Sequence, residues 1–154
     1  MNLSEILRPE AIKVVASASS KKRLLHDIGE LAHGVYGYES TLVIEALMER
    51  ESLGPTGVGN GVALPHARLA EVTDMSAAFI LLEKPVNFDA IDRQPVDVGM
   101  ALFAPEAAGV EHLKALALVS RTLRSADLCN KLRANHDPTT LYALLTQDQN
   151  TQAA

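Results

Sequence analysis

The sequence predicts an α/β fold in which a mixed β-sheet is sandwiched between helices. Three observations support this class. The chain of 154 residues is 47% hydrophobic and 21% charged, as is typical of one ordinary globular domain. Two nearly continuous apolar runs, at residues 75–86 and 95–106, have the pattern of strands buried on both faces. Helical periodicity precedes and follows these runs, and elements in such an order pack as layers.

The first third of the chain predicts one strand followed by two helices. Residues 11–16 are short, β-branched and apolar, as expected for a strand. A run of serines then caps a helix, which we expect to end at Gly34. A second amphipathic helix is expected over residues 39–53, where Gly54 and Pro55 stop it. The apolar sides of the two helices are Leu24, Leu25, Ile28, Leu31 and Ala32 in the first, and Leu42, Leu47 and Met48 in the second.

The remainder predicts three strands and then three helices. A short extended segment at residues 62–69 precedes the two apolar strands, which residues 87–94 connect as a turn. The three helices are expected over residues 109–123, 125–135 and 137–147. Ser125 and Asp137 cap the last two helices, and Pro138 lies in the first turn of the third. The first of these helices has an expected apolar stripe of Leu113, Leu116, Ala117 and Leu123.

Charge and cysteine content exclude several classes of protein. The net charge of −5 and the pI of about 5.5 argue against direct binding of DNA or RNA, which requires a basic surface. The single cysteine, Cys129, allows no intrachain disulfide and is expected to be a small buried residue. The start of the chain lacks the pattern of a signal peptide, and no apolar run reaches the ~18 residues of a membrane span. We therefore expect a cytoplasmic protein without membrane segments.

A glycine-rich stretch, "GPTGVGNGVALPHARL" at residues 54–69, is the most unusual part of the sequence. A phosphate-binding P-loop would end in lysine and Ser or Thr, whereas Gly61 is followed by Val62. A dinucleotide fingerprint would leave a strand and open a helix, whereas these glycines leave a helix and open a strand. The sequence context therefore excludes both standard nucleotide-binding motifs.

The same stretch can still bind an anion through its backbone. Successive amides of Gly57, Gly59, Asn60 and Gly61 could point at a phosphate, because glycine and asparagine tolerate positive φ. Pro65 would then fix the extended chain that presents His66. From the loop alone, a plain helix-to-strand turn is the open alternative.

Among the other polar residues, two are the best candidates to join His66. His112 lies at the border of an apolar stripe just after a strand end, where sites in α/β sheets collect, although a packing histidine is the alternative. Arg50 lies in the last turn before the glycines and could clamp a phosphate, or be a solvated charge. Strand alternation would place Arg68 on the same face as His66. The remaining histidines, His26, His33 and His136, are expected at surface or capping positions.

Three segments together resemble one family. "RESLGPTGVGNGVALPHAR" (residues 50–68) is similar to the active-site segment of EIIA domains of the bacterial phosphotransferase system. "DRQPVDVGMALFAPE" and "EHLKALALVSRTLR" resemble a later strand and a histidine-bearing helix of that family. The closest type is the nitrogen-regulatory one (enzyme IIA-Ntr) of the mannitol/fructose-type superfamily. The resemblance spans about residues 3–147 and implies a single EIIA domain over residues 1–154, with 148–154 as a frayed polar tail.

The resemblance implies a function and a set of residues for it. His66 would accept a phosphoryl group, on Nε2, from a small HPr-like carrier (NPr) that enzyme I-Ntr charges from phosphoenolpyruvate. His112 would position His66 by a hydrogen bond, and Arg50 would contact the phosphate. Partners would be regulated proteins such as potassium-transport or sensor components, and the oligomeric state stays open. No cofactor and no metal are implied, and the family fold agrees with the pattern of elements.

Three alternatives to this function remain. A sugar-transport EIIA would pass the phosphoryl group from His66 to the cysteine of an EIIB domain. A protein-binding module would dock partners without chemistry. A metal hydrolase is disfavoured, because spacing offers His66 and His112 but no third ligand and no HExxH pattern. Val58, Leu64 and Leu69 lie near His66 in the sequence. They could form an exposed apolar rim on which a partner protein docks, or they could be buried in the core.

Overall fold

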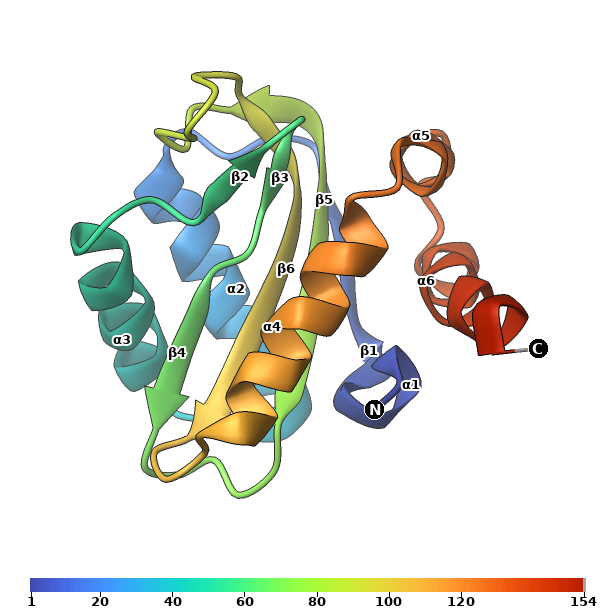
Figure 1. Ribbon diagram of the computed structural model, residues 1–154. Coiled ribbons are helices and arrows are strands. Elements are labelled where there is room, and N and C mark those ends of the chain that lie inside the picture. The colour runs from blue at the N-terminus through green and yellow to red at the C-terminus, as the bar shows by residue number, and fades with distance from the viewer. Residues whose placement is uncertain (154) are drawn as a thin grey trace.

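A computed structural model of the chain describes the backbone of residues 1–153 and the side chains of residues 1–147 (Figure 1). The predicted frayed tail at 148–154 lies outside the residues whose side chains are described. The strands are β1 (Leu7–Val15), β2 (Gly57–Gly59), β3 (Val62–Ala63), β4 (His66–Leu69), β5 (Ser76–Val86) and β6 (Val96–Pro105). The helices are α1 (Leu3–Ile6), α2 (Lys21–Tyr36), α3 (Ser40–Ser52), α4 (Val110–Leu123), α5 (Ala126–Arg133) and α6 (Pro138–Ala153).

The strands form one mixed sheet, as predicted. Its order is β1-β5-β6-β3-β2, and β4 pairs with β6 beyond the end of β3. The long strands β5 and β6 run antiparallel to each other, whereas β1 is parallel to β5, and both β3 and β4 are parallel to β6. Strands β5 and β6 are therefore central, which explains why their sequences are nearly continuous in apolar residues.

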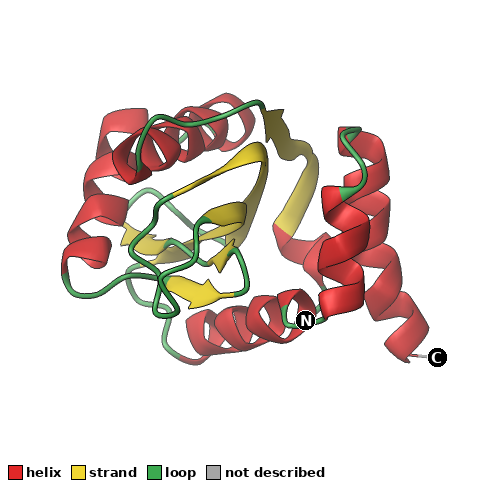
Figure 2. Ribbon diagram, turned by 90° about the horizontal axis from the view of Figure 1, so that it is seen from above, coloured by secondary structure: helices red, strands yellow, loops and turns green. Residues whose placement is uncertain are grey.

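Helices cover both faces of this sheet, which confirms the predicted class. Helices α2 and α3 lie on one side, and α4, α5 and α6 lie on the other (Figures 1 and 2). Phe79 and Phe103 are fully buried within this sandwich. Cys129 is buried as predicted, and burial raises the pKa of its thiol. Among the described residues, no helix is both long enough and apolar enough to cross a bilayer.

The boundaries of several elements differ from the sequence prediction. Strand β1 begins at Leu7 rather than at residue 11, and the short helix α1 precedes it. Helix α2 continues through Gly34 to Tyr36, because the left-handed residue that ends it is Gly37, with φ of 77°. Ser125 caps α5 as predicted, since its hydroxyl oxygen accepts from the Leu128 amide.

The predicted apolar stripes of α3 and α4 are partly wrong. Leu113 and Ala117 are exposed on α4, whereas its buried residues are His112, Ala115, Leu118, Val119 and Leu123. Leu42 is likewise half-exposed on α3, where the buried residues are Val43, Leu47 and Glu51. Each helix is therefore rotated so that a polar side chain faces inward, and these two polar side chains belong to the site described below.

The glycine-rich stretch forms a β-hairpin. Strands β2 and β3 pair antiparallel, and Asn60 and Gly61 between them have φ of 59° and 78°. Two successive residues at positive φ make the tight turn that matches the twist of paired strands, and Asn-Gly is its preferred sequence. The sequence pattern predicts a loop here, so the hairpin differs from the prediction.

Candidate functional site

His66 is placed by an interrupted strand along one edge of β6. Val62 pairs with Val98 and His66 pairs with Leu102, so β3 and β4 follow the same edge in succession. The interruption is at Pro65, which has no amide hydrogen to donate, although its carbonyl oxygen accepts from the Leu102 amide at 2.9 Å. The proline thus ends one ladder and starts the next, with His66 as the first residue of β4.

Successive side chains along β4 point to opposite faces of the sheet, so His66 and Arg68 share one face. His66 and Arg68 face away from the core, while Ala67 and Leu69 are buried. His66 and Arg68 both line an open pocket of about 470 Å³, whose wall also includes Arg50 and His112. The structure therefore brings together the three residues that the sequence singled out, with Arg68 beside them.

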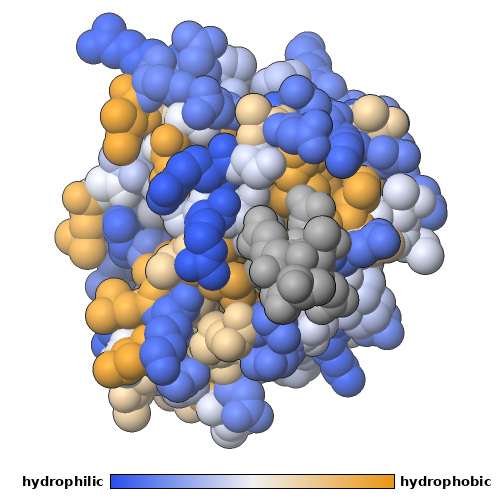
Figure 3. All heavy atoms as spheres, turned by 45° about the vertical axis from the view of Figure 1, so that its right-hand side comes forward, coloured by the Kyte–Doolittle hydropathy of each residue, from blue (hydrophilic) through white to orange (hydrophobic). Residues whose placement is uncertain are grey.

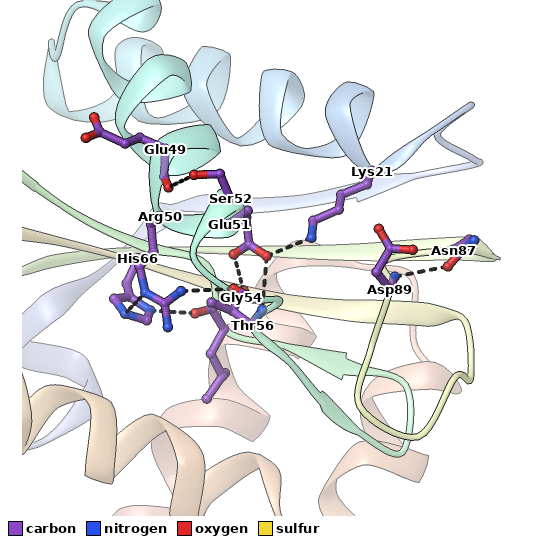
Figure 4. A network of polar contacts seen from close by, with 11 residues as sticks. Lys21, Glu49, Arg50, Glu51, Ser52, Gly54, Thr56, His66, Asn87 and Asp89 are labelled. Carbon is purple, nitrogen blue, oxygen red and sulfur yellow. Dashed lines mark hydrogen bonds and ion pairs between the residues drawn. The ribbon is translucent and has the colours of Figure 1, made fainter.

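Hydrogen bonds fix the tautomer of His66. Its Nδ1 lies 2.9 Å from the carbonyl oxygen of Leu64, and a carbonyl can only accept, so Nδ1 holds the proton. Nε2 is then unprotonated, and its lone pair accepts a hydrogen bond from Nε of Arg50 at 3.2 Å (Figure 4). The expected source of this orientation was a hydrogen bond from His112. The backbone carbonyl of Leu64 supplies it instead.

Arg50 reaches His66 from the last turn of α3. Its Nη1 donates to the carbonyl oxygen of Gly54 at 2.9 Å, beyond the end of the helix (Figure 4). Leu53 and Gly54 close the helix by donating their amides to the carbonyls of Arg50 and Glu51. The guanidinium is therefore held at two points, one on the turn after α3 and one on His66.

His112 contacts His66 without a hydrogen bond between the two rings. The rings meet edge to face, with centroids 5.4 Å apart and planes at 65°. His112 lies in the first turn of α4 and is 6% exposed. Its Nδ1 is buried and has no hydrogen-bond partner among the described residues.

The surroundings favour the neutral form of both histidines by lowering their pKa values. Burial lowers the pKa of His66 below its ordinary value of 6.5, the Leu64 carbonyl raises it, Arg50 lowers it and Glu51 raises it. Burial, followed by the neighbouring His66 and Arg68, also lowers the pKa of His112. A neutral imidazole with a free Nε2 lone pair is a nucleophile at neutral pH.

The glycines of the hairpin lie apart from this pocket. The amide of Asn60 donates to Oδ2 of Asp92, and Gly61 packs against Arg133, whose Nη2 donates to the carbonyl oxygen of Asn60. Gly57 backs onto Ala90, and neither Gly57, Gly59, Asn60 nor Gly61 lines the pocket of His66. The structure therefore does not bring the predicted phosphate loop to His66.

The three apolar residues considered for a docking rim, Val58, Leu64 and Leu69, differ in burial. Leu64 and Leu69 belong to the core, and Val58 is half-exposed on the hairpin. Leu53, which lines the pocket, is 82% exposed, and Leu113, which directly follows the pocket residue His112 in the sequence, is 65% exposed. Figure 3 shows that the face formed by α4, α5 and α6 is mainly hydrophilic, with apolar atoms in separate groups.

Two of the remaining histidines, His33 and His136, contact oxygen atoms of residues outside the pocket. His33 contacts the Tyr38 carbonyl oxygen through Nδ1 at 2.8 Å, and His136 lies 3.1 Å from a carboxylate oxygen of Glu83. Among the described residues, no three His, Cys, Asp or Glu side chains are grouped so as to hold a metal ion.

Sequence reasoning missed a buried polar cluster beside Arg50. The Glu51 carboxylate accepts from both the amide and the hydroxyl of Thr56, and it pairs with Nζ of Lys21 at 2.9 Å (Figure 4). Glu51 and Thr56 are both buried. The one available signal was a Glu at the helical spacing of Val43 and Leu47, which places it on the buried face of α3.

Comparison with known proteins decides the family. The sequence model described as "Phosphoenolpyruvate-dependent sugar phosphotransferase system, EIIA 2" matches residues 5–148. The chain belongs to this EIIA 2 family. Within it, the chain is similar to proteins named "Nitrogen regulatory protein". The one from Bradyrhizobium diazoefficiens is 41% identical over 145 residues, which are 94% of this chain and 95% of the relative. The one from Escherichia coli K12 is 40% identical over 98% of this chain and 93% of the relative.

A solved EIIA structure agrees with this similarity. The nitrogen regulatory protein IIA-Ntr from Neisseria meningitidis superposes with a TM-score of 0.85 at 37% identity, over 93% of this chain and 98% of that one. The EIIA 2 family and the nitrogen-regulatory resemblance proposed from the three sequence segments are thus confirmed. His66, Arg50 and His112 lie together in the pocket of this EIIA domain.

Proposed function

We propose that the chain is a phosphohistidine-carrying regulator of a nitrogen-related phosphotransferase system. His66 accepts a phosphoryl group on Nε2 from an HPr-like carrier (NPr), which enzyme I-Ntr charges from phosphoenolpyruvate. The observation that supports this most directly is the tautomer of His66. The Leu64 carbonyl holds the proton on Nδ1, which leaves Nε2 unprotonated, with Arg50 as its hydrogen-bond donor, in a residue that lines an open pocket.

The transfer conserves atoms and charge between two imidazoles. The Nε2 lone pair attacks phosphorus, the N–P bond to His66 forms, and the P–N bond to the donor histidine breaks. The donor ring, protonated on its other nitrogen, leaves as neutral imidazole with the electron pair of the broken bond. His66 keeps its Nδ1 proton on the Leu64 carbonyl, so no acid or base has to act in this step.

Charge stabilisation comes from the residues around Nε2. Arg50 caps the lone pair in the free protein, and it moves its Nε donor to a phosphoryl oxygen while Nη1 stays on Gly54. The His112 ring meets the His66 ring edge to face and lines the same pocket, so this ring lies beside the incoming group. Arg68 lines the same pocket and adds a second positive charge.

The phosphorylation state then regulates partner proteins. We place the chain in the cytoplasm, with potassium-transport or sensor components as its targets. Exposed Leu53 lines the pocket and exposed Leu113 directly follows the pocket residue His112, and these two side chains supply apolar docking contacts for the carrier and the targets. The alternative is a sugar-transport EIIA that passes the group to an EIIB cysteine. The similarity to nitrogen regulatory proteins over nearly the whole chain favours the regulator.

Intact mass spectrometry tests the proposal. The protein is mixed with phosphoenolpyruvate and with enzyme I-type and HPr-type proteins. Wild type should gain one acid-labile phosphoryl group, His66→Ala should gain none, and His112→Ala should gain it more slowly. His33→Ala, at a structural contact outside the pocket, is the matched control and should behave as wild type. Absence of phosphorylation with competent carriers would refute the relay and leave a protein-binding module.

A further inference from the structure

One buried carboxylate connects the two hydrogen bonds that hold His66. Glu51 accepts the Thr56 amide at 3.0 Å and the Thr56 hydroxyl, and Lys21 neutralises it across the α2–α3 interface. Lys21 also lies over the ring of Phe88, with Nζ 4.6 Å from the centroid. Three donors thus compensate the burial of this charge, so its position is strongly determined.

Thr56 is linked to the ring of His66 through the backbone of Leu64. The carbonyl oxygen of Thr56 accepts the Leu64 amide at 2.9 Å, and the carbonyl of Leu64 accepts the Nδ1 proton of His66 at 2.9 Å. A displacement of Thr56 therefore moves the acceptor that selects the His66 tautomer.

The same cluster positions Arg50 from the other side. Gly54 lies between Glu51 and Thr56, and its carbonyl oxygen accepts from Nη1 of Arg50. The side chain of Glu51 closes this short turn by reaching forward to Thr56 (Figure 4). The hydrogen bonds thus form a ring that runs through the turn, the Leu64 carbonyl, His66 and Arg50.

We propose that Glu51, held by Thr56 and Lys21, is a positioning residue that selects the Nδ1–H tautomer of His66 and aims Arg50 at Nε2. It touches neither phosphate nor donor, and it acts through the backbone of Leu64 and Gly54. This inference rests on the proposed phosphoryl acceptance by His66. The tautomer itself is measurable without any phosphoryl donor, so the two proposals can fail separately.

The charges around His66 predict a second effect of Glu51. The charged or titratable groups that face His66 are Glu49, Arg50 and Glu51 from α3, Arg68 from its own strand and His112 from α4. The negative charge of Glu51 raises the pKa of His66. A neutral residue at position 51 should therefore lower that pKa, which loss of packing alone would not do.

The experiment compares matched variants with a small donor, phosphoramidate, that needs no docking surface. Glu51→Gln removes the charge and keeps the shape. Thr56→Val removes the hydroxyl, whereas Thr56→Ser retains it. We expect phosphorylation to slow about tenfold or more in Glu51→Gln and Thr56→Val, and to stay near the wild-type rate in Thr56→Ser, because misplaced reacting groups are costly. The control is Asp97→Asn, which breaks an ion pair of the same 2.9 Å length with Arg133 outside the pocket.

Nitrogen NMR of the His66 ring decides between positioning and general destabilisation. Wild type should show the Nδ1–H tautomer, and Glu51→Gln should show an increased Nε2–H fraction and a lower His66 pKa. Asp97→Asn should change neither. The proposal is overturned if Glu51→Gln and Thr56→Val keep the wild-type tautomer and pKa, whatever their rates. If wild type accepts no phosphoryl group, the relay fails, while these NMR data still test the role of Glu51.

Discussion

Replacing Gly61 by alanine should weaken the fold and leave phosphoryl acceptance intact. Gly61 has φ of 78°, in the left-handed region that an L-residue with a Cβ adopts at a cost of about 1–2 kcal/mol. A Cβ there would lie 2.6 Å from Nη2 of Arg133 and 2.9 Å from Oδ1 of Asp97. Arg133 must therefore move, and its 2.7 Å hydrogen bond to the Asn60 carbonyl is lost.

The size of the effect follows from these two losses. Because Arg133 is partly exposed, its displaced hydrogen bond contributes only about 1 kcal/mol. The positive φ of residue 61 costs the alanine variant about 1–2 kcal/mol more. The free energy of unfolding should therefore fall by about 2–3 kcal/mol in total. For a protein of this size, each kcal/mol shifts Tm by about 2–4 °C, so we expect a decrease of roughly 4–12 °C.

Thermal unfolding and phosphorylation by phosphoramidate below Tm are the two assays. Gly34→Ala is the matched control, because Gly34 is helical, with no atom within 4 Å of an added Cβ, and should gain about 0.5–1 kcal/mol. An unchanged Tm in Gly61→Ala would refute the turn argument. A folded Gly61→Ala protein that accepts phosphate tenfold more slowly would show that the hairpin glycines do serve the site.

Three further predictions concern the pocket. Arg50→Met should slow phosphoryl acceptance about a hundredfold, measured as single-turnover mass gain, because a preorganised charged donor is lost. The free energy of unfolding, measured by urea titration, should fall as pH decreases below 6.5 toward the lowered pKa values of His66 and His112. The reason is that these two histidines bind protons more readily in the unfolded chain than in the folded one. His112→Gln should make this decrease in stability smaller. Leu113→Ser should change that free energy by less than about 0.5 kcal/mol and raise KM for an HPr-type carrier, since this leucine is exposed and directly follows His112, which lines the pocket. An unaltered KM would exclude Leu113 from docking.

The parts of the fold that the sequence predicts well are those with one dominant local cause. Strands β5 and β6 are central in the sheet, so burial on both faces leaves a nearly continuous apolar run. The cap at Ser125 depends on a single side-chain hydrogen bond within three residues. His66 and Arg68 share a face because alternation along a strand is fixed.

The hairpin shows why the glycine stretch was harder to interpret. Asn60-Gly61 is a strong hairpin signal, but the strands on either side have only three and two residues, Gly57–Gly59 and Val62–Ala63. Strands this short have no visible alternation. Their pairing depends on β6, on Ala90 behind Gly57 and on Arg133 behind Gly61, all distant in sequence.

The faces of α3 and α4 were misassigned for a different reason. Hydrophobicity alone assigns Leu113 to the core and Glu51 to the surface, yet the structure reverses both. Burial of Glu51 requires Lys21 from another helix and Thr56 from the following turn, and no single helix pattern contains these partners.

The chemistry of His66 depends on the least visible of these interactions. A sequence identifies a histidine but not which of its nitrogens holds the proton. Here the choice is made by a main-chain carbonyl, that of Leu64, whose position depends on Thr56 and through it on Glu51. A main-chain acceptor leaves no trace in residue type, because every residue has one. The side chain that holds the acceptor in place does leave a trace, and for that reason Glu51, rather than Leu64, is the position where substitution can test the mechanism.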